Sequence, residues 1–158
     1  MCLKLHSVAM PESDLPAMSA RAFAGPLLVT IAYVVAYYLM IIHQVVVKAR
    51  LRRSYRARGE TFDRYLGGDR EMLAADRVVG NMLEHMPAFL VLLWLNATFV
   101  GPRGAALAGG AYVLSRLVYP LIMGRRLGTG MPSRIMFATA IGYVVLAYFV
   151  VRLIGAVV

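Results

Sequence analysis

Four long apolar runs, separated by shorter polar segments, dominate the chain. They cover residues 26–47, 72–100, 104–123 and 135–158. Each run is close to or above the roughly 20 residues that an α-helix needs to cross the hydrocarbon core of a bilayer. Apolar residues are continuous within the runs, whereas the strands of a membrane barrel would alternate apolar and polar positions. The pattern therefore predicts an all-α protein, a bundle of four transmembrane helices.

Turn signals between the runs place the ends of these helices. Pro26 suits the first turn of a helix, Gly67-Gly68 breaks the long first loop, and Gly101-Pro102 marks a tight turn. We expect helices at about 26–49, 72–100, 104–123 and 133–157, within one membrane domain over residues 25–158. Residues 1–20 lack the apolar core of a signal peptide, and we expect an N-terminal tail over residues 1–24.

The positive charge of the chain is concentrated in two loops. The formal net charge is +9, six of the eleven residues from 48 to 58 are Lys or Arg, and residues 124–134 hold three more arginines. Because positive loops stay on the cytoplasmic side of a membrane, we expect the first and third loops there. Basic segments beside spans also attract anionic lipid headgroups. The charge thus indicates a partner in the membrane rather than a nucleic acid, and the short, plain chain favours a bacterial inner membrane.

Composition supports a membrane protein and narrows the possible chemistry. Sixty per cent of the residues are hydrophobic and only 16% are charged, against about 25% charged residues in soluble domains. A soluble fold of 158 residues could not bury that much apolar surface. Cys2 is the single cysteine, which excludes an internal disulfide and a cysteine-based metal site.

The second apolar run carries an unusual polar cluster. Arg77, Asn81 and Glu84 stand at i, i+4 and i+7, which places them on one stripe of a helix. Ionisable side chains inside a span are costly and by default indicate a functional site. The alternative is an Arg77–Glu84 ion pair that serves only assembly, within one chain or between copies. Three aligned polar residues favour a binding site over this alternative.

Three further arginines are expected at the same membrane depth as Arg77. Arg50 follows the first helix, Arg116 lies in the second half of the third, and Arg134 opens the fourth. Four cations that converge at one end of a bundle indicate an anionic ligand. For Arg50 and Arg134 taken singly, snorkelling toward lipid headgroups is the simpler explanation. Arg116 lies seven residues before the expected helix end and is harder to explain in this way.

The pattern Arg77-x-x-x-Asn81-x-x-Glu84-x-x-Pro87, on the second of four helices, resembles the MAPEG superfamily. That group includes microsomal glutathione transferases, prostaglandin E synthase, leukotriene synthase and a non-enzymatic lipoxygenase-activating protein. The resemblance covers about residues 25–155, and the basic first loop agrees with it. It implies a homotrimer that binds glutathione as a co-substrate between adjacent subunits, near the cytosolic face.

The resemblance also implies a role for each candidate residue. The glutathione-binding set would be Arg50, Arg77, Asn81, Glu84, Arg116 and Tyr119, of which the last two match the family's Arg-x-x-Tyr element. Arginines would bind the two carboxylates of the tripeptide, since their planar fork suits carboxylates, and Glu84 would bind its ammonium group. Arg134 would be the catalytic residue, because a nearby arginine stabilises the thiolate that acts as nucleophile.

These observations support three functional hypotheses. The leading one is a membrane-bound glutathione-dependent transferase or peroxidase that acts on lipophilic electrophiles from the bilayer, a chemistry that needs no metal. The alternative is a non-catalytic, lipid-binding or scaffolding member, which Met123 supports because many members have a tyrosine at that position. The third is a small transporter with Glu84 as coupling carboxylate, although a transporter would more often carry a lone carboxylate in mid-membrane.

Overall fold

The computed structural model describes residues 21–128 and 133–158, and these residues form four α-helices. The helices are α1 (Ala24–Ala57), α2 (Arg70–Phe99), α3 (Pro102–Met123) and α4 (Ser133–Val157). Each contains a stretch that is long and apolar enough to cross a membrane. The four-helix membrane bundle predicted from the apolar pattern is confirmed.

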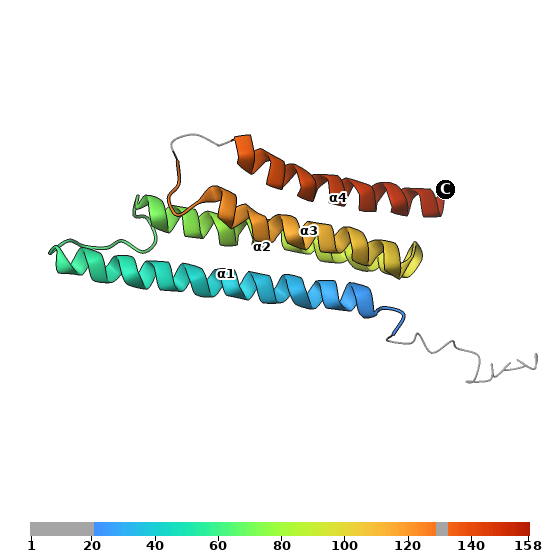
Figure 1. The fold of residues 1–158 in the computed structure, drawn as a ribbon, viewed down its shortest axis with the longest axis horizontal. Helices are drawn as coiled ribbons and strands as arrows, with labels where there is room; N and C mark the ends of the chain where they lie inside the picture. The colour runs from blue at the N-terminus through green and yellow to red at the C-terminus, as the bar shows by residue number, and fades with distance from the viewer. Residues whose placement is uncertain (1–20, 129–132) are drawn as a thin grey trace, which may run out of the picture.

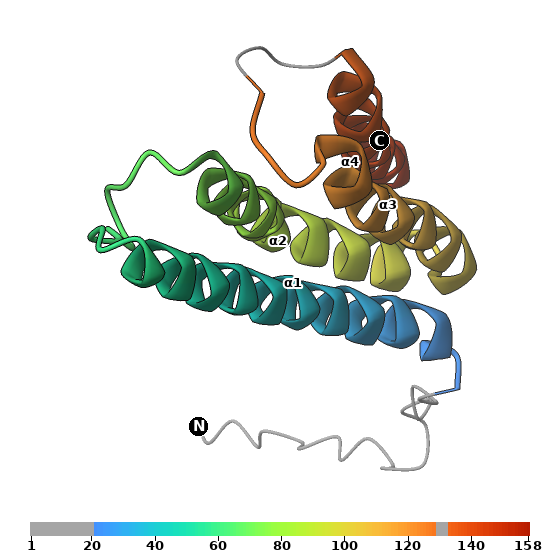
Figure 2. The same ribbon diagram turned by 60° about the vertical axis from the view of Figure 1, so that its left-hand side comes forward.

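α2 and α3 form the centre of the bundle (Figures 1 and 2). α1 packs against both of them on one side and α4 on the other, and no contact joins α1 to α4 within the described residues. The first and third loops lie at one end, opposite the α2–α3 turn. Two hydrogen bonds tie this loop end together: the Leu127 N–H donates to the Arg70 carbonyl (2.9 Å), and Arg70 Nε donates to the Leu127 carbonyl (2.7 Å).

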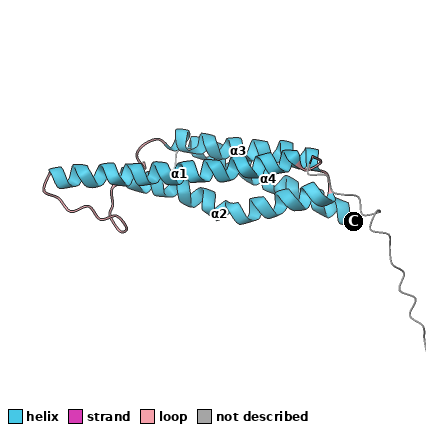
Figure 3. Ribbon diagram, turned by 90° about the horizontal axis from the view of Figure 1, so that it is seen from below, coloured by secondary structure: helices cyan, strands magenta, loops and turns pink. Residues whose placement is uncertain are grey.

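α1 is longer than the sequence suggested, because it ends at Ala57 rather than near residue 49. The positive residues after position 47 indicate where the chain leaves the membrane, but Arg and Lys are good helix formers and sustain the helix until Gly59, whose φ is 73°. At 1.5 Å per residue, the 34 residues of α1 extend about 51 Å. A hydrocarbon core is only about 30 Å thick. The last turns of α1 accordingly project past the other helices (Figure 3).

A buried aromatic cluster sets how α1, α2 and α3 face one another. The rings of Phe89 on α2 and Tyr112 on α3 stack with centroids 4.1 Å apart. Tyr33 on α1 lies 5.0 Å from Phe89 and donates a 2.6 Å hydrogen bond from its hydroxyl to the Met82 carbonyl. Because all three rings are buried, the cluster fixes which side of α2 turns inward.

Small residues and one asparagine bring the remaining helix surfaces together. A side chain at Gly109 of α3 would lie 2.8 Å from Leu93 and 2.9 Å from Val29, so the three helices meet there. Small residues allow this close approach of helices in lipid. Asn96 of α2 donates from Nδ2 to the Phe149 carbonyl of α4 at 3.1 Å. That hydrogen bond ties α4 to the central pair.

The first loop is held against the start of α2 by Asp69. Its Oδ1 accepts from the backbone N–H groups of Glu71 (2.9 Å) and Met72 (3.1 Å), and its Oδ2 accepts from the Tyr55 hydroxyl (2.9 Å). Burial acts to raise the pKa of the Asp69 carboxyl, but the donated hydrogen bonds outweigh it and hold the pKa below its usual range. Asp69 thus caps α2 and anchors the end of α1 to it.

We expect Asp69→Ala to lower the thermal stability of the detergent-solubilised protein. The cap and the tyrosine hydrogen bond together contribute about 2 kcal/mol. Because the folded-state pKa is depressed, this contribution is complete above the ordinary carboxyl pKa of about 4 and is lost as the pH falls through the lower folded-state value. Melting at neutral pH is the measurement, and Asp69→Asn, which keeps an acceptor, should recover most of the loss. Equal melting of Asp69→Ala and the parent chain would contradict the cap.

Candidate functional site

The polar stripe predicted on α2 divides into an exposed and a buried part. Arg77 and Glu84 form the exposed part, with side chains that are 52% and 58% exposed and charged atoms 3.7 Å apart. Seven residues separate them, or about 10 Å along the axis, so the ion pair reaches across two turns. Glu84 is the fifteenth of the 30 residues of α2 and lies at its middle. Two charges exposed at this depth are costly in lipid unless a partner or a ligand covers them.

Asn81 and Arg116 form the buried part. Arg116 of α3 is 2% exposed and donates from Nη1 to Asn81 Oδ1 at 2.6 Å. Its guanidinium also lies over the ring of Tyr112, at 4.8 Å from the centroid. Within the described chain its Nε and Nη2 have no hydrogen-bond acceptor. A cation held by one neutral amide and one ring keeps donors free for a further acceptor.

Gly142 of α4 makes room for the Arg116 side chain. A Cβ at this position would overlap with Arg116 Nη2 and come within 2.8 Å of its Cζ. The guanidinium therefore occupies the space that a side chain on α4 would fill. Sequence reasoning missed Gly142, because a glycine in an apolar run reads as an ordinary helix-packing position.

Tyr119 lies one turn beyond Arg116 and connects the two parts of the stripe. Tyr119 is only 3% exposed, so the bundle covers it almost completely. The ring packs in a small apolar cluster with Ala74, Val78, Met123 and Ile135. The fold thus brings five of the seven candidate residues to neighbouring positions on α2 and α3: Arg77, Asn81, Glu84, Arg116 and Tyr119.

Arg50 lies at a different place. It forms an ion pair with Glu71 at the start of α2, and Arg125 approaches the same carboxylate at 3.8 Å. All three line a cavity of about 730 Å³ between α1, α2 and α3, whose apolar walls include Met40, Val46, Val47, Ala74, Ala75, Val78, Leu117 and Leu121. At 100° per residue, the α2 positions in this cavity lie about 120° around the helix from Arg77 and Glu84. Within one chain, Arg50 and the exposed ion pair therefore face different sides of α2.

Glu71 and Arg134 remain to be compared with the predictions from the sequence. Glu71 was missed, because an acidic residue in the first turn of a helix is expected simply as a helix-start signal. Arg134 belongs to the first turn of α4, but its side chain lies outside the described residues.

We expect Gly142→Ala to displace the Arg116 guanidinium and to break its hydrogen bond to Asn81. Loss of that buried, charge-assisted bond should cost roughly 1–3 kcal/mol, measured as a lower melting temperature in detergent. Gly155→Ala is the matched control, since a Cβ there meets nothing within 4 Å and alanine has the higher helix propensity. Unchanged melting of Gly142→Ala would show that Arg116 does not depend on this space.

Comparison with known proteins agrees with the four-helix membrane fold. The model of the MAPEG family matches residues 27–155, a segment that begins in the first turn of α1 and ends in the last turns of α4. No curated protein sequence matches the chain. The match covers more than half of the chain and includes every helix, in agreement with four spans of membrane-crossing length. This chain is an integral, multi-pass membrane protein that belongs to the MAPEG family.

Proposed function

We propose that the protein is a membrane-bound glutathione-dependent transferase or peroxidase that acts on lipophilic electrophiles. Family membership supports glutathione-related or eicosanoid chemistry in a membrane at a general level. The observation that carries the more specific proposal is the half-exposed Arg77–Glu84 pair, whose carboxylate lies at the middle of α2. A purely structural ion pair in a span would be expected inside the bundle, whereas this one turns outward.

Glutathione offers the groups that this pair lacks. The tripeptide carries two carboxylates and one ammonium group, so Arg77 can bind a carboxylate while Glu84 binds the ammonium. The single contact of 3.7 Å between the two side chains would then be replaced by two separate ion pairs. Each new pair can have better geometry than one stretched over two helical turns, and charge-assisted hydrogen bonds are among the strong ones.

Asn81 and Arg116 would position the ligand from behind the ion pair. Since Asn81 Oδ1 accepts from Arg116, its amide is oriented with the NH₂ group free to donate elsewhere. A ligand carboxylate at the stripe can accept from that group and benefit from the buried cation of Arg116. Tyr119, which packs against Ala74 and Val78 of α2, would offer its hydroxyl as a further donor near the stripe.

Arg134 would supply the chemistry at the thiol. A free thiol has a pKa of about 8.5 and is mostly protonated at neutral pH. A guanidinium beside the sulfur favours the thiolate, and the released proton passes to solvent. In a substitution the sulfur then forms the new C–S bond while the leaving group departs with the bonding electron pair. This role comes to Arg134 by resemblance of its Pro132-Ser133-Arg134 segment to the family.

In a homotrimer, a neighbouring copy would shield the exposed Arg77–Glu84 ion pair from lipid. The outward stripe of α2 also presents Leu73, Val91 and Leu95, so a neighbouring copy could cover it with apolar contacts around the charges. Arg50 faces another side of its own α2 and would complete the site on the adjacent copy. The first and third loops, with their positive charge, would face the cytoplasm of a bacterial cell.

The lipophilic substrate would enter from the bilayer. The cavity between α1, α2 and α3 has apolar walls, and its volume of about 730 Å³ falls within the roughly 300–1,000 Å³ of small-molecule sites. Because the cavity and the exposed ion pair lie on different sides of one α2, thiolate and electrophile would meet between adjacent copies.

A second candidate, a non-catalytic lipid-binding or scaffolding protein, is favoured by Met123. This side chain is buried beside Tyr119 and cannot donate a hydrogen bond where many family members have a tyrosine. A site with one hydroxyl fewer would still bind glutathione, but with weaker support for catalysis.

We expect glutathione to bind saturably to the detergent-solubilised protein in calorimetric titration, and Glu84→Ala to weaken this binding. Removing the carboxylate deletes a charged contact of about 1.5–3 kcal/mol, or roughly tenfold to 150-fold in Kd. Glu60→Ala is the control, because Glu60 lies in the first loop and, within residues 21–128 and 133–158, its one ion pair is with Arg58. Absence of binding at millimolar glutathione would contradict the glutathione-dependent enzyme and would favour the lipid-binding or scaffolding candidate, or a different thiol.

We expect Arg134→Ala to reduce turnover of a reactive aryl halide by roughly a hundredfold, which corresponds to two units of thiol pKa, while glutathione still binds. The pH profile should shift upward, since the thiol would ionise at higher pH without the guanidinium. Arg126→Ala, in the preceding loop, is the control. Parental turnover in Arg134→Ala would remove its catalytic role, and glutathione binding without any turnover in the parent chain would favour the second candidate.

A further inference from the structure

A basic hollow lies on the side of α1, apart from the site described above. Its volume is about 660 Å³, and it is lined by Val45, Lys48, Ala49, Arg52, Arg53 and Arg56 of α1 and by Phe62 and Arg64 of the first loop. Five of these eight residues are basic and none is acidic. So many cations around one concave surface generate a strong positive potential, which concentrates anions there.

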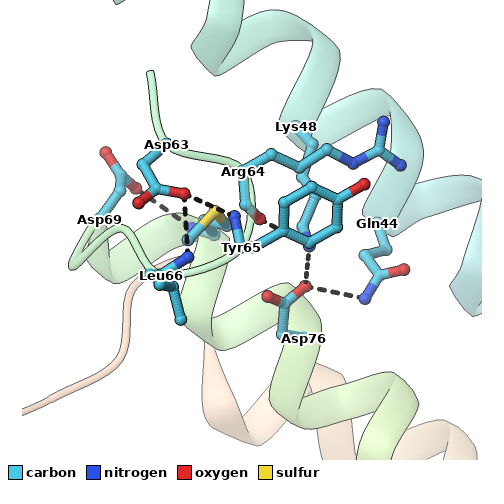
Figure 4. A network of polar contacts seen from close by, with 9 residues as sticks. Gln44, Lys48, Asp63, Arg64, Tyr65, Leu66, Asp69 and Asp76 are labelled. Atoms are coloured by element: carbon cyan, nitrogen blue, oxygen red, sulfur yellow. Dashed lines mark hydrogen bonds and ion pairs between the residues drawn. The ribbon is translucent and has the colours of Figure 1, made fainter. Parts of the chain in front are cut away.

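The hollow forms because the first loop folds back onto α1 and is held there by specific contacts. Lys48 donates from Nζ to the Arg64 carbonyl at 3.4 Å, and the rings of Tyr55 and Phe62 meet edge to face at 5.3 Å. The Asp63 carboxylate accepts hydrogen bonds from the backbone N–H groups of Tyr65 and Leu66, both at 2.9 Å (Figure 4). These bonds close a tight turn. These contacts place Phe62 and Arg64 opposite the arginines of α1.

The lysine in the hollow is neutralised, whereas the arginines are not. Lys48 forms an ion pair with Asp76 of α2 at 2.8 Å, and Gln44 donates to the same carboxylate at 2.7 Å (Figure 4). In contrast, the four arginines of the hollow have no carboxylate within ion-pair distance among residues 21–128 and 133–158: Arg52, Arg53, Arg56 and Arg64. Like charges so close together repel one another. An anion between the guanidinium groups would relieve this repulsion.

The position of the hollow along α1 identifies the kind of anion. Below it runs an apolar stripe at spacings of three and four residues, each member at least 49% exposed: Leu28, Ile31, Val35, Tyr38, Ile42 and Val45. The same spacing continues through Ala49 to Arg52 and Arg56. From Val35 to Val45 the stripe is about 15 Å long at 1.5 Å per residue, or half of a hydrocarbon core of about 30 Å. One face of α1 therefore presents one leaflet's depth of apolar surface that ends in a cluster of arginines.

We propose that this hollow binds the headgroup of an anionic phospholipid, with an acyl chain of the same molecule lying along the apolar stripe of α1. The phosphodiester would accept hydrogen bonds from the guanidinium groups, whose planar fork suits phosphate oxygens. A soluble phosphate could pair with the arginines, but it has no acyl chain to contact the apolar stripe. The inference is independent of the proposed glutathione chemistry.

The test compares lipid retention in two variants with the same change in net charge. The purified protein in neutral detergent is given phosphatidylglycerol and phosphatidylcholine with identical acyl chains, and bound lipid per chain is counted by native mass spectrometry. The first variant is Arg52→Gln/Arg53→Gln/Arg56→Gln, which leaves Lys48 to hold the loop. The control is Arg21→Gln/Arg103→Gln/Arg152→Gln, whose residues lie near the opposite end of the bundle.

We expect the parent chain to retain one phosphatidylglycerol per chain in preference to phosphatidylcholine. Three arginines near a membrane surface should account for between tenfold and roughly a hundredfold of this preference, lost in the first variant and kept in the control. Arg56→Glu, with Arg103→Glu as its control, gives the same comparison should the triple variant not fold.

Three outcomes would overturn the proposal. An equal loss in the variant and the control would mean attraction by net charge alone. Displacement of the lipid by inorganic phosphate at equal concentration would indicate a site for free anions, without a role for the stripe. A change of oligomeric state in the first variant, with no lipid preference in the parent chain, would assign the hollow to contact with a second copy.

Discussion

A charge in hydrocarbon must be paired, buried among polar groups, or covered, and this cost governs the arrangement of the whole protein. The bundle contains few carboxylates for its many arginines. The arginines therefore have three kinds of environment. Arg116 is buried against Asn81 and the Tyr112 ring, and Arg77 pairs with Glu84 on the outside of the bundle. The arginines at the end of α1 lie where the apolar surface of that helix ends. The fold therefore separates cations that serve the bundle from cations that remain available to ligands.

The central pair of helices links these solutions. The aromatic cluster of Tyr33, Phe89 and Tyr112 fixes the rotation of α2, and the same rotation turns Asn81 inward and Glu84 outward. Burial of Arg116 depends in turn on α4, because the guanidinium occupies space above Gly142. A stripe that begins as three aligned residues thus becomes a layered arrangement, with the buried Asn81–Arg116 hydrogen bond behind an exposed ion pair.

Two sides of α2 carry different groups, and a single chain does not bring these groups together. An apolar cavity with Arg50, Glu71 and Arg125 lies on one side, and the Arg77–Glu84 pair lies about 120° away on the other. In a cyclic ring of three or more copies, unlike faces of adjacent copies meet, so a site between subunits of the proposed trimer would combine them. Family membership and that geometry together support the proposed thiol chemistry.

The spans, their number and the α2 stripe could be predicted from the sequence, because helical periodicity and the length of apolar runs are local properties. The stripe predicted that Arg77, Asn81 and Glu84 share one side of a helix, but not that Asn81 would point to Arg116 while Glu84 remained exposed. The end of α1 was misplaced, since basic residues mark the edge of the membrane and not the end of the helix. Gly142 and Glu71 gave no signal of their own, because their roles depend on partners on other helices. What the sequence alone determined was therefore which segments cross the membrane and which residues share a helical face. Tertiary packing decided which charges are neutralised, which are buried and which stay exposed, because that depends on distances between residues far apart in the chain.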